Sequence, residues 1–491
     1  VKIAELLTVS GDLIGAPRPI THHVKFFEKG DRPLEFITTR QWFVRLMDKK
    51  ERLVEAGERI QWHPEFMGAR YRNWTENLQI DWCISRQRYF GVPFPVWYPV
   101  DADGRVRHDQ PIVAEQKDLP VDPTAQVPPG YTEAQRDQRD GFTGENDVFD
   151  TWFTSSLTPQ IASGWWLRPA SHERLFPMDL RPQSHEIIRT WAFYTIAKAL
   201  LHEDQIPWKH VGISGWVLDP DRKKMSKSKG NVVTPIDLLE QYGTDAIRYW
   251  AASGRPGVDT ALDEGQMKIG RKLGTKLLNA SKFVLSFGEP PAGATATEAI
   301  DLAMQARLRS VVAEATAAFE SFDYARALEA TEQFFWWFCD DYVELVKSRA
   351  YGVHGPQGAA SAQAALRAAL HTILRLFAPF IPFVTDEVWS WWQPGSVHNQ
   401  AWPSRDALGA AGDATLLDPV CEVLAAIRRC KTEAKASQKA GVSLLVVHAP
   451  TELHAAIASA ETDLRDAGSI AELRYEHADV LACDIVLADP A

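Results

Sequence analysis

The sequence has 491 residues, of which 45% are apolar, and a formal net charge of -11. This length exceeds one hydrophobic core and predicts two to four globular domains, while the acidic total argues against indiscriminate nucleic-acid binding. The sequence contains no run of about eighteen apolar residues, so we predict no membrane span. The five cysteines form no Cys-x-x-Cys pair, so we expect neither a disulfide framework nor a zinc site, and we predict a cytoplasmic protein.

The first half of the chain carries the signals of an α/β domain. "CISRQRYFGVPFPVWYPV" (83–100) reads as a buried β segment, and the polar, proline-rich stretch 101–141 reads as an irregular insertion. "DVFDTWF" (147–153) is a strand candidate, "SHEIIRTWAFYTIAKALLHE" (184–203) a helix and "KHVGISGWVL" (209–218) a second strand. Strand, helix and strand with short connections predict a parallel sheet whose functional loops follow the carboxyl ends of the strands.

The second half is helical and ends in a smaller module. "GEPPAGATAT" (288–297) has the composition of a linker, and the amphipathic segments from 298 to about 402 indicate an α-bundle, with the aromatic run 334–338 in its core. From about Leu416 a helix, a strand, a helix and two strands alternate. We therefore predict an α/β fold with a partial Rossmann-like parallel sheet, followed by an α-helical bundle and a small terminal α/β domain.

A strongly basic loop follows the last strand of the first half. "RKKMSKSKGN" (222–231) places four lysines and two serines within seven residues and ends on a glycine and an asparagine. Ammonium groups and hydroxyls after a parallel strand suit phosphate oxygens. A solvated basic loop is the alternative for an arbitrary Lys/Ser run.

The letters "KMSKS" (224–228) match the nucleotide loop of the class I aminoacyl-tRNA synthetases, and the chain resembles that family. The resemblance implies that the loop closes over ATP, bound with Mg²⁺, and stabilises charge on the phosphates while an amino-acid carboxylate attacks the α-phosphorus. It assigns Lys227 as the main catalytic contact and Lys224 as its assistant. The implied ATP-binding set is completed by Met225, Ser226, Ser228 and Glu186.

Further segments resemble the large aliphatic branch of this family, and in particular its valyl members. They are "RQWFVRL", "NWTENLQIDWCISRQRYFGVPFPVWY", "DVFDTWFTSSLTP" and "GTDAIRYWAASG". Isoleucine members typically show "WFDSG" where this chain has "WFTSS". By the resemblance Trp152, Ile187 and Trp191 line a valine pocket, and the i, i+4 spacing of the last two places them on one helix face. Ordinary core packing of an amphipathic helix is the alternative.

Polar residues open the same predicted helix. Gln183, His185 and Glu186 could reach the ribose or the amino group of a substrate, whereas helix capping by Ser184 is an equally acceptable interpretation. An apolar pocket excludes isoleucine by size but rejects threonine poorly. Valyl-tRNA synthetases are the known case, with discrimination of roughly a hundredfold, so an editing site is implied elsewhere.

One family signature is missing. No His-x-Gly-His occurs among the fourteen histidines. The chain begins at Val1, so we expect a portion of a longer valine–tRNA ligase that is inactive alone. The expected domains are the trailing edge of an editing insertion (1–22), the carboxyl-terminal part of the catalytic domain (23–290), an anticodon-binding bundle (298–415) and a terminal α/β domain (416–491). A non-catalytic tRNA-binding subunit and an isoleucine-type ligase remain as alternatives.

Two basic clusters could follow an RNA backbone. Lys268, Arg271, Lys272 and Lys276 recur at three- and four-residue spacing on one predicted helix. A second cluster precedes the last domain and consists of Arg428, Arg429, Lys431, Lys435 and Lys439. Each is a candidate for phosphate contacts and has a solvated helix face as its alternative. The expected partners are tRNA(Val), valine and ATP, with a monomeric protein, no membrane and no zinc or other bound metal.

Overall fold

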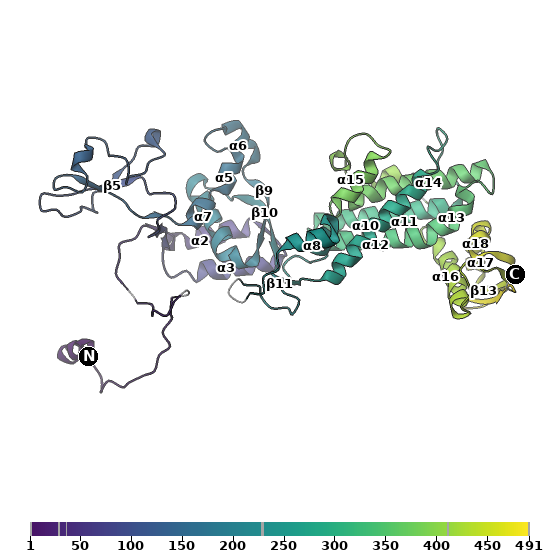
Figure 1. Cartoon of the computed structure of the whole chain (residues 1–491), viewed down its shortest axis with the longest axis horizontal. Coiled ribbons are helices and arrows are strands. Elements are labelled where there is room, and N and C mark those ends of the chain that lie inside the picture. Colours follow the sequence, from purple (N-terminus) through teal and green to yellow (C-terminus); the bar gives the residue numbers. More distant parts are fainter. Residues whose placement is uncertain (1, 28–29, 36, 227–229, 410–411, 490–491) are drawn as a thin grey trace. The chain divides into compact units, whose positions relative to one another are not determined.

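The computed structural model describes residues 2–27, 30–35, 37–226, 230–409 and 412–489. The chain divides into two compact units, Val1–Lys49 with Gln79–Thr154, and Lys50–Leu78 with Ser155–Ala491. Figure 1 follows the elements along the chain. Lys227, Ser228 and Lys229 of the basic loop lie outside the described residues.

The first unit is built from short strands. Trp97, Val121 and Phe142 form its small core. Strand β1 (Phe43–Val44) pairs with β3 (Trp82–Cys83), β4 (Ser85–Arg86) pairs with β8 (Val148–Phe149), and β5 (Val96–Pro99) lies between β6 (Ile112–Val113) and β7 (Phe142–Gly144), all antiparallel. Its helical segments are α1 (Lys2–Ser10), η1 (Met47–Lys49), η3 (Gln116–Asp118) and η4 (Glu133–Gln135), and α4 (Thr151–Ser155) ends one residue past this unit.

The second unit begins with a parallel sheet. Strand β10 (Trp208–Ser214) lies between β2 (Gln61–His63) and β9 (Met178–Ser184), and both pairings are parallel. Around these strands the chain forms α2 (Lys50–Glu58), η2 (Glu65–Met67), α3 (Gly68–Glu76), α5 (Thr158–Ser163), α6 (Pro169–Leu175) and α7 (Phe193–Glu203). A parallel βαβ unit is therefore present, as predicted.

The prediction was wrong about which strand opens that unit. The segment "DVFDTWF" supplies β8, which pairs antiparallel with β4 in the first unit, and the parallel partner of β10 is β9. Strand β9 contains Arg181, Pro182 and Gln183, which are poor strand formers, so its sequence gave no strand signal. Gln183 therefore lies on a strand and not on the predicted helix.

The predicted helix 184–203 is also not uniform. It begins as a 3-10 turn, η5 (His185–Ile187), continues as a π-helical turn, η6 (Ile188–Ala192), and becomes α-helical only in α7. Ser184 caps it, because its hydroxyl accepts a hydrogen bond from the Glu186 amide at 3.4 Å. Such π-turns are often found at functional sites.

Past β10 the second unit becomes helical. Strand β11 (Val217–Leu218) pairs with β12 (Thr260–Ala261), and α8 (Pro235–Tyr242), α9 (Thr244–Ala252) and α10 (Glu264–Leu285) lead into the bundle. The bundle comprises α11 (Ala299–Glu320), α12 (Tyr324–Trp337), η8 (Phe338–Tyr342), α13 (Val343–Ala350), α14 (Pro356–Phe377), α15 (Pro382–Ser390), η9 (Val397–Asn399) and η10 (Arg405–Leu408). Phe334, Phe335 and Phe338 are buried, which confirms the prediction that the aromatic run belongs to the core.

The terminal module is a three-stranded sheet with helices. Strand β13 (Val442–Ala449) lies between β14 (Ile470–His477), to which it is parallel, and β15 (Ala482–Leu487), to which it is antiparallel. Helices α16 (Leu417–Glu433), α17 (Thr451–Ser459) and α18 (Glu461–Gly468) complete it. The order of elements is the predicted one, except that the single helix predicted between the first two strands is divided into α17 and α18.

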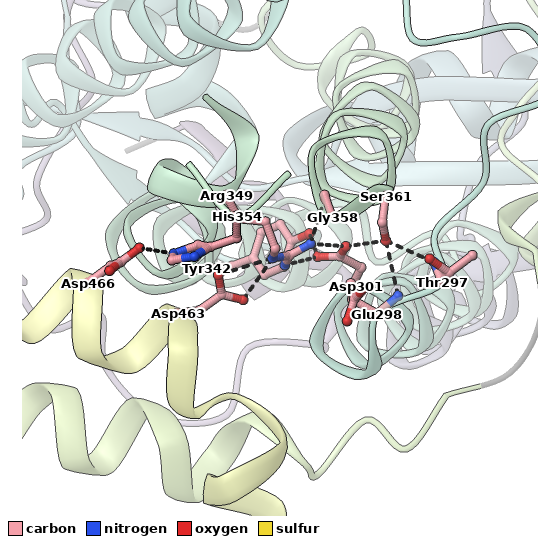
Figure 2. Close-up of polar contacts among 10 residues, drawn as sticks. All are labelled: Thr297, Glu298, Asp301, Tyr342, Arg349, His354, Gly358, Ser361, Asp463 and Asp466. Atoms are coloured by element: carbon pink, nitrogen blue, oxygen red, sulfur yellow. Dashed lines mark hydrogen bonds and ion pairs between the residues drawn. The ribbon is translucent and has the colours of Figure 1, made fainter. Parts of the chain in front are cut away.

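A buried ionic cluster joins the module to the bundle. Arg349 on α13 makes a bidentate pair with Asp301 on α11, at 2.7 and 2.8 Å, and its Nε contacts both carboxylate oxygens of Asp463 on α18 at 3.0 Å (Figure 2). The side chains of Arg349, Asp301 and Asp463 are 6%, 0% and 7% exposed. The contact therefore excludes water almost completely.

Candidate active site

A cavity of about 740 Å³ lies beside the end of β9 in the second unit. The sheet is parallel, and the carboxyl ends of parallel strands are where α/β folds bind ligands. Its walls come from α3, from the turns η5 and η6 that follow β9, and from the segments around β11 and β12. The lining residues are Arg70, Asn73, Trp74, His185, Glu186, Ile188, Arg189, Trp216, Lys224 and Asp259.

Lys224, the first lysine of the KMSKS segment, points at a carboxylate in this cavity. Its Nζ lies 2.6 Å from Glu186 Oε1 and 4.2 Å from the centre of the Trp216 ring. Trp216 Nε1 donates to the other oxygen of Glu186 at 2.9 Å. Hydrogen bonds from Lys224 and then Trp216 lower the pKa of Glu186, so this carboxylate is ionised at neutral pH. The two sequence-predicted residues Lys224 and Glu186 are thus brought together, and Trp216, which the sequence did not single out, completes the contact.

Both ends of the basic loop are tied to Asp219. The Lys223 amide donates to Asp219 Oδ1 at 2.7 Å, and Asn231 Nδ2 donates to Asp219 Oδ2 at 2.7 Å. Asn231 Oδ1 in turn accepts from the Ser226 amide at 3.0 Å. These bonds, the first above all, lower the pKa of Asp219. Gly230, at φ 67°, has the left-handed conformation that favours glycine.

The described residues at the base of the KMSKS loop therefore form a closed turn. Met225 and Ser226 lie within this turn, whereas Lys227 and Ser228 fall outside the described residues and their predicted ATP contacts stay predictions. The sequence clue to Asp219 and Asn231 was present, since Asp and Asn flank the basic run and both residue types form turns of this kind.

His185 is fixed by a second carboxylate. Its Nε2 lies 3.2 Å from Asp259 Oδ1, which also accepts from the Trp216 amide at 2.8 Å, and its ring meets Trp216 edge-on. His185 Nδ1 and Gln183 Oε1 are buried without a hydrogen-bond partner among the described residues. His185 and Glu186 therefore line the cavity, whereas Gln183 lies on β9 and is not among the lining residues.

The three predicted valine-pocket residues are divided between the units. Trp152 belongs to the first unit, and Ile187 and Trp191 belong to the second, so their joint pocket stays a prediction. Ile187 ends the 3-10 turn and Trp191 lies in the π-turn, which changes the i, i+4 α-helical relation on which we based a common face. Trp191 Nε1 donates to the Ser155 carbonyl at 3.4 Å.

The basic stripe of α10 is partly occupied by contacts within the protein. Lys276 pairs with Asp340 at 2.9 Å, Arg271 donates to the Gln241 carbonyl at 3.1 Å, and Lys272 lies over the Trp336 ring. The exposed Lys268 makes no such contact with any other described residue.

The second basic cluster includes a buried member. Lys431 is 1% exposed, and its Nζ donates to the carbonyls of Gln438 and Gly468 at 3.0 and 2.9 Å. Arg428 pairs with Asp341 at 2.8 Å. These two side chains therefore serve the fold of the module. Arg429, Lys435 and Lys439 are exposed, and their contacts with phosphates stay a prediction.

The described residues show no sign of a metal site or of a membrane span. No group of three or more His, Cys, Asp and Glu side chains is arranged to hold a metal ion. No described helix has the length and apolar character needed to cross a membrane.

Known families and individual relatives together match nearly the whole chain. Residues 20–263 match the family of class I tRNA synthetases for I, L, M and V, and residues 301–446 match the anticodon-binding domain of tRNA ligase. Curated relatives include the valine–tRNA ligases of Thermobifida fusca, 55% identical over 99% of this chain and 56% of that protein, and of Salinispora tropica, 54% identical over 97% and 58%. The chain thus spans somewhat more than half the length of these relatives.

Solved structures show the same fold at low identity. The LeuRS of Agrobacterium radiobacter, in a ternary complex with tRNA and LeuAMS, has a TM-score of 0.53 at 17% identity and covers 83% of this chain and 51% of its own. The methionyl-tRNA synthetase of Mycobacterium tuberculosis, in complex with methionyl-adenylate, has a TM-score of 0.54 at 18% identity, covering 74% and 65%. The chain has the α/β fold with a parallel sheet and a helical region that these enzymes share, and it belongs to the class I tRNA synthetases of the isoleucine, leucine, methionine and valine group.

Proposed function

We propose that this chain serves a valine–tRNA ligase, in which it supplies the KMSKS side of the adenylate-forming site and the tRNA-binding bundle. The observation that carries the proposal is the position of Lys224, a signature lysine held by a carboxylate at the mouth of a cavity beside the end of a parallel strand. The valine–tRNA ligases that match it along 97 to 99% of its length support the choice of amino acid.

The proposed reaction begins with ATP and valine. A valine carboxylate oxygen attacks the α-phosphorus, a new oxygen–phosphorus bond forms, and the bond to the bridging oxygen of pyrophosphate breaks. Negative charge grows on the leaving pyrophosphate. Once Lys224 has left Glu186, its ammonium group can stabilise that charge. Mg²⁺ enters with ATP as part of the substrate. A ribose hydroxyl of the tRNA then takes the valyl group and AMP leaves.

The rest of the cavity suits the nucleoside side of this substrate. Glu186 is a hydrogen-bond acceptor, and Trp216 offers an indole beside it. Trp152, Ile187 and Trp191 would bound the valine side chain. Lys268 on α10 and the helical bundle would contact tRNA(Val), since a cation without a partner among the described residues is the one most able to meet a phosphate.

The test is ATP–pyrophosphate exchange with valine, isoleucine and threonine. It uses the 491-residue chain and a chimera in which this chain replaces the matching segment of the Thermobifida fusca ligase. We expect the chimera to exchange with valine well above isoleucine, and the chain alone to be inactive because it contains no His-x-Gly-His. A chimera that prefers isoleucine, or a folded chimera that activates neither amino acid, would overturn the proposal.

A second candidate is a tRNA-binding subunit without catalysis of its own. The lack of His-x-Gly-His in these 491 residues favours it. Filter binding of the chain to tRNA(Val), together with the native mass of the protein in its cell, separates the two candidates. A cytoplasmic location, a monomeric state and freedom from zinc also remain predictions for the same protein.

A further inference from the structure

Arg181 on β9 has its guanidinium enclosed by two tryptophans. Its Cζ lies 3.2 Å from the centre of the Trp191 ring and 5.0 Å from that of Trp208. Its Nε and Nη2 are buried and have no hydrogen-bond partner among the described residues, and no described carboxylate pairs with it. Burial lowers its pKa to about 10, so the group is still a cation at neutral pH.

A buried cation without a carboxylate is costly, and an apolar side chain could fill the same volume without that cost. Three other arginines among the described residues also lie on indoles, and one of them, Arg189, is exposed and lies 5.6 Å from the centre of the Trp74 ring. Arg307 stacks on Trp337 but also pairs with Asp418, and Arg367 stacks on Trp392 but also donates to the Gly288 carbonyl. Among the described residues, Arg181 differs in that two indoles enclose it, one of them at 3.2 Å, and in that it has no carboxylate or carbonyl partner besides them.

The two partners of this stack, Arg181 and Trp191, differ in how well the backbone and hydrogen bonds fix them. Arg181 lies on a strand and is in register with Val211 in the middle of the sheet. Trp191 lies in the π-turn, and its own hydrogen bond, to Ser155, is long at 3.4 Å. An indole has two faces, and the guanidinium covers one of them at van der Waals distance. A ligand of Trp191 must therefore use the other face or the ring edge.

We propose that Arg181 is a positioning residue that fixes the plane of the Trp191 indole and thereby sets the size of the amino-acid pocket. The inference rests on the proposed function, in which Trp191 bounds the valine side chain. With the guanidinium in place the indole cannot retreat toward the sheet, and the additional methylene of isoleucine has no room. Without it the indole can tilt into the vacated volume.

The first experiment compares R181A, R181M and R181K in the chimera, by the ratio of kcat/KM for valine to that for isoleucine in pyrophosphate exchange. One methylene in an apolar pocket is worth roughly 10- to 200-fold, so we expect R181A and R181M to lower the ratio about tenfold or more, mainly through faster isoleucine activation. R181K keeps the cation and should retain more of the ratio. A ratio is independent of how much enzyme is folded.

R367A is the matched control, since it removes an arginine–indole stack in the bundle and should leave the ratio unchanged. The second experiment labels the 491-residue chain with 5-fluorotryptophan and assigns the Trp191 resonance with W191F. We expect R181A and R181M, but not R367A, to shift or broaden that resonance.

The outcomes separate this inference from the proposed function. A normal valine preference in R181A and R181M, or an unmoved Trp191 resonance, overturns the role of Arg181 and leaves the ligase intact. If the wild-type chimera does not activate valine, the proposed ligase function is overturned, and so is the role of Arg181 in the amino-acid pocket. The fluorine signal would then report only on the contact between Arg181 and Trp191.

Discussion

At the scale of single residues, the contact of Lys224 with Glu186 is strong enough to place the lysine and weak enough to release it. Both side chains are 47% exposed, and an ion pair in such a setting is worth at most about 1 kcal/mol. A triphosphate carries several charges and can displace the carboxylate. We therefore expect K224M in the chimera to lower kcat/KM for ATP by about 100-fold in pyrophosphate exchange, since one group that stabilises transition-state charge contributes about that much.

The adjacent Lys223 gives a matched control. It pairs loosely with Asp221 at 3.6 Å, and its side chain is 70% exposed. K223M removes the same charge one residue away and should change kcat/KM by less than about threefold. Equal losses in the two variants would show that the net charge of the loop, and not the position of Lys224, governs ATP use.

The sequence predicted this site in part. The KMSKS letters identified Lys224, Met225 and Ser226, because a signature marks the groups that meet the substrate. The residues that hold them are Trp216, Asn231 and, through Asn231, Asp219. They lie outside these five letters, and only the Asp and Asn that flank the basic run gave a turn signal. Arg181 was missed for a related reason, since a lone arginine in a polar strand gives no sign that two distant indoles enclose it.

At the scale of elements, helices were predicted better than strands. The bundle and the terminal module follow from amphipathic periodicity, which extends over many residues. Strand β9 is seven residues long and includes Pro182, so its pairing with β10 is set by the sheet and not by local propensity. The π-turn η6 has no sequence signal at all, and a helical period was the natural interpretation.

The Arg349 cluster is an element-scale contact, because it links α11 and α13 to α18. Asp301 also accepts hydrogen bonds from Tyr342 and Ser361 at 2.7 and 2.6 Å (Figure 2). R349M would leave two buried carboxylates without a cation. We expect it to lower the free energy of unfolding by about 3–5 kcal/mol, measured by urea denaturation.

A surface arginine of the same bundle provides the comparison. Arg326 pairs with Glu314 at 3.2 Å, with side chains 61% and 47% exposed. R326M removes an ion pair of the same chemistry in water and should cost less than about 1 kcal/mol. A similar loss of unfolding free energy in both variants would mean that burial does not increase the cost of removing the arginine from the cluster.

The packing of α14 against α15 predicts a dependence of stability on pH. His371 lies between Trp389 and Trp392, and its Nδ1 is 3.1 Å from Arg375 Nη2. Burial, and then the charge of Arg375, lower the pKa of His371 to about 4. The folded protein thus keeps this imidazole neutral, while the unfolded chain takes up a proton near pH 6.5. Stability should fall as the pH drops from about 6.5 toward 4.

The contribution of His371 over that range is about 3 kcal/mol, from roughly 1.4 kcal/mol per pH unit. We expect H371F to flatten the acid limb of the unfolding free energy in urea titrations between pH 7 and pH 4.5. H477Q, at an exposed position on β14, is the control. An acid limb that is unchanged in H371F would assign the dependence to other groups, among which His63 and His202 also have pKa values lowered by desolvation.

At the scale of the whole molecule, the bundle and the terminal module share one hydrophobic core. A single cluster of buried side chains runs from Leu273 on α10 through the bundle to Leu424 and Ile427 on α16 and to Leu445 on β13. The family match to the anticodon-binding domain likewise extends to residue 446, within β13. The terminal module therefore contributes to the stability of the bundle, although its sequence pattern predicts a separate domain.

Truncation after residue 415 tests this shared core. The shortened chain loses the buried apolar face of α16 and the Asp463 partner of Arg349. Arg349 keeps Asp301 as its partner, so most of the loss comes from the exposed apolar core, at about 1.5–3 kcal/mol for each fully buried apolar side chain. A loss of several kcal/mol corresponds to a fall in Tm of about 10 °C. We expect differential scanning calorimetry to show such a fall in the transition of the bundle.

A double-mutant cycle makes the same test sharper. In the truncated chain R349M leaves only Asp301 unpaired, so it should cost clearly less than in the full chain, and the coupling between the two changes should exceed about 1 kcal/mol. Equal costs in both backgrounds, or a bundle whose Tm survives truncation, would show that the module is only tethered. A coupling of this size would mean that the terminal module contributes to the stability of α11 and α13, the helices that carry Asp301 and Arg349.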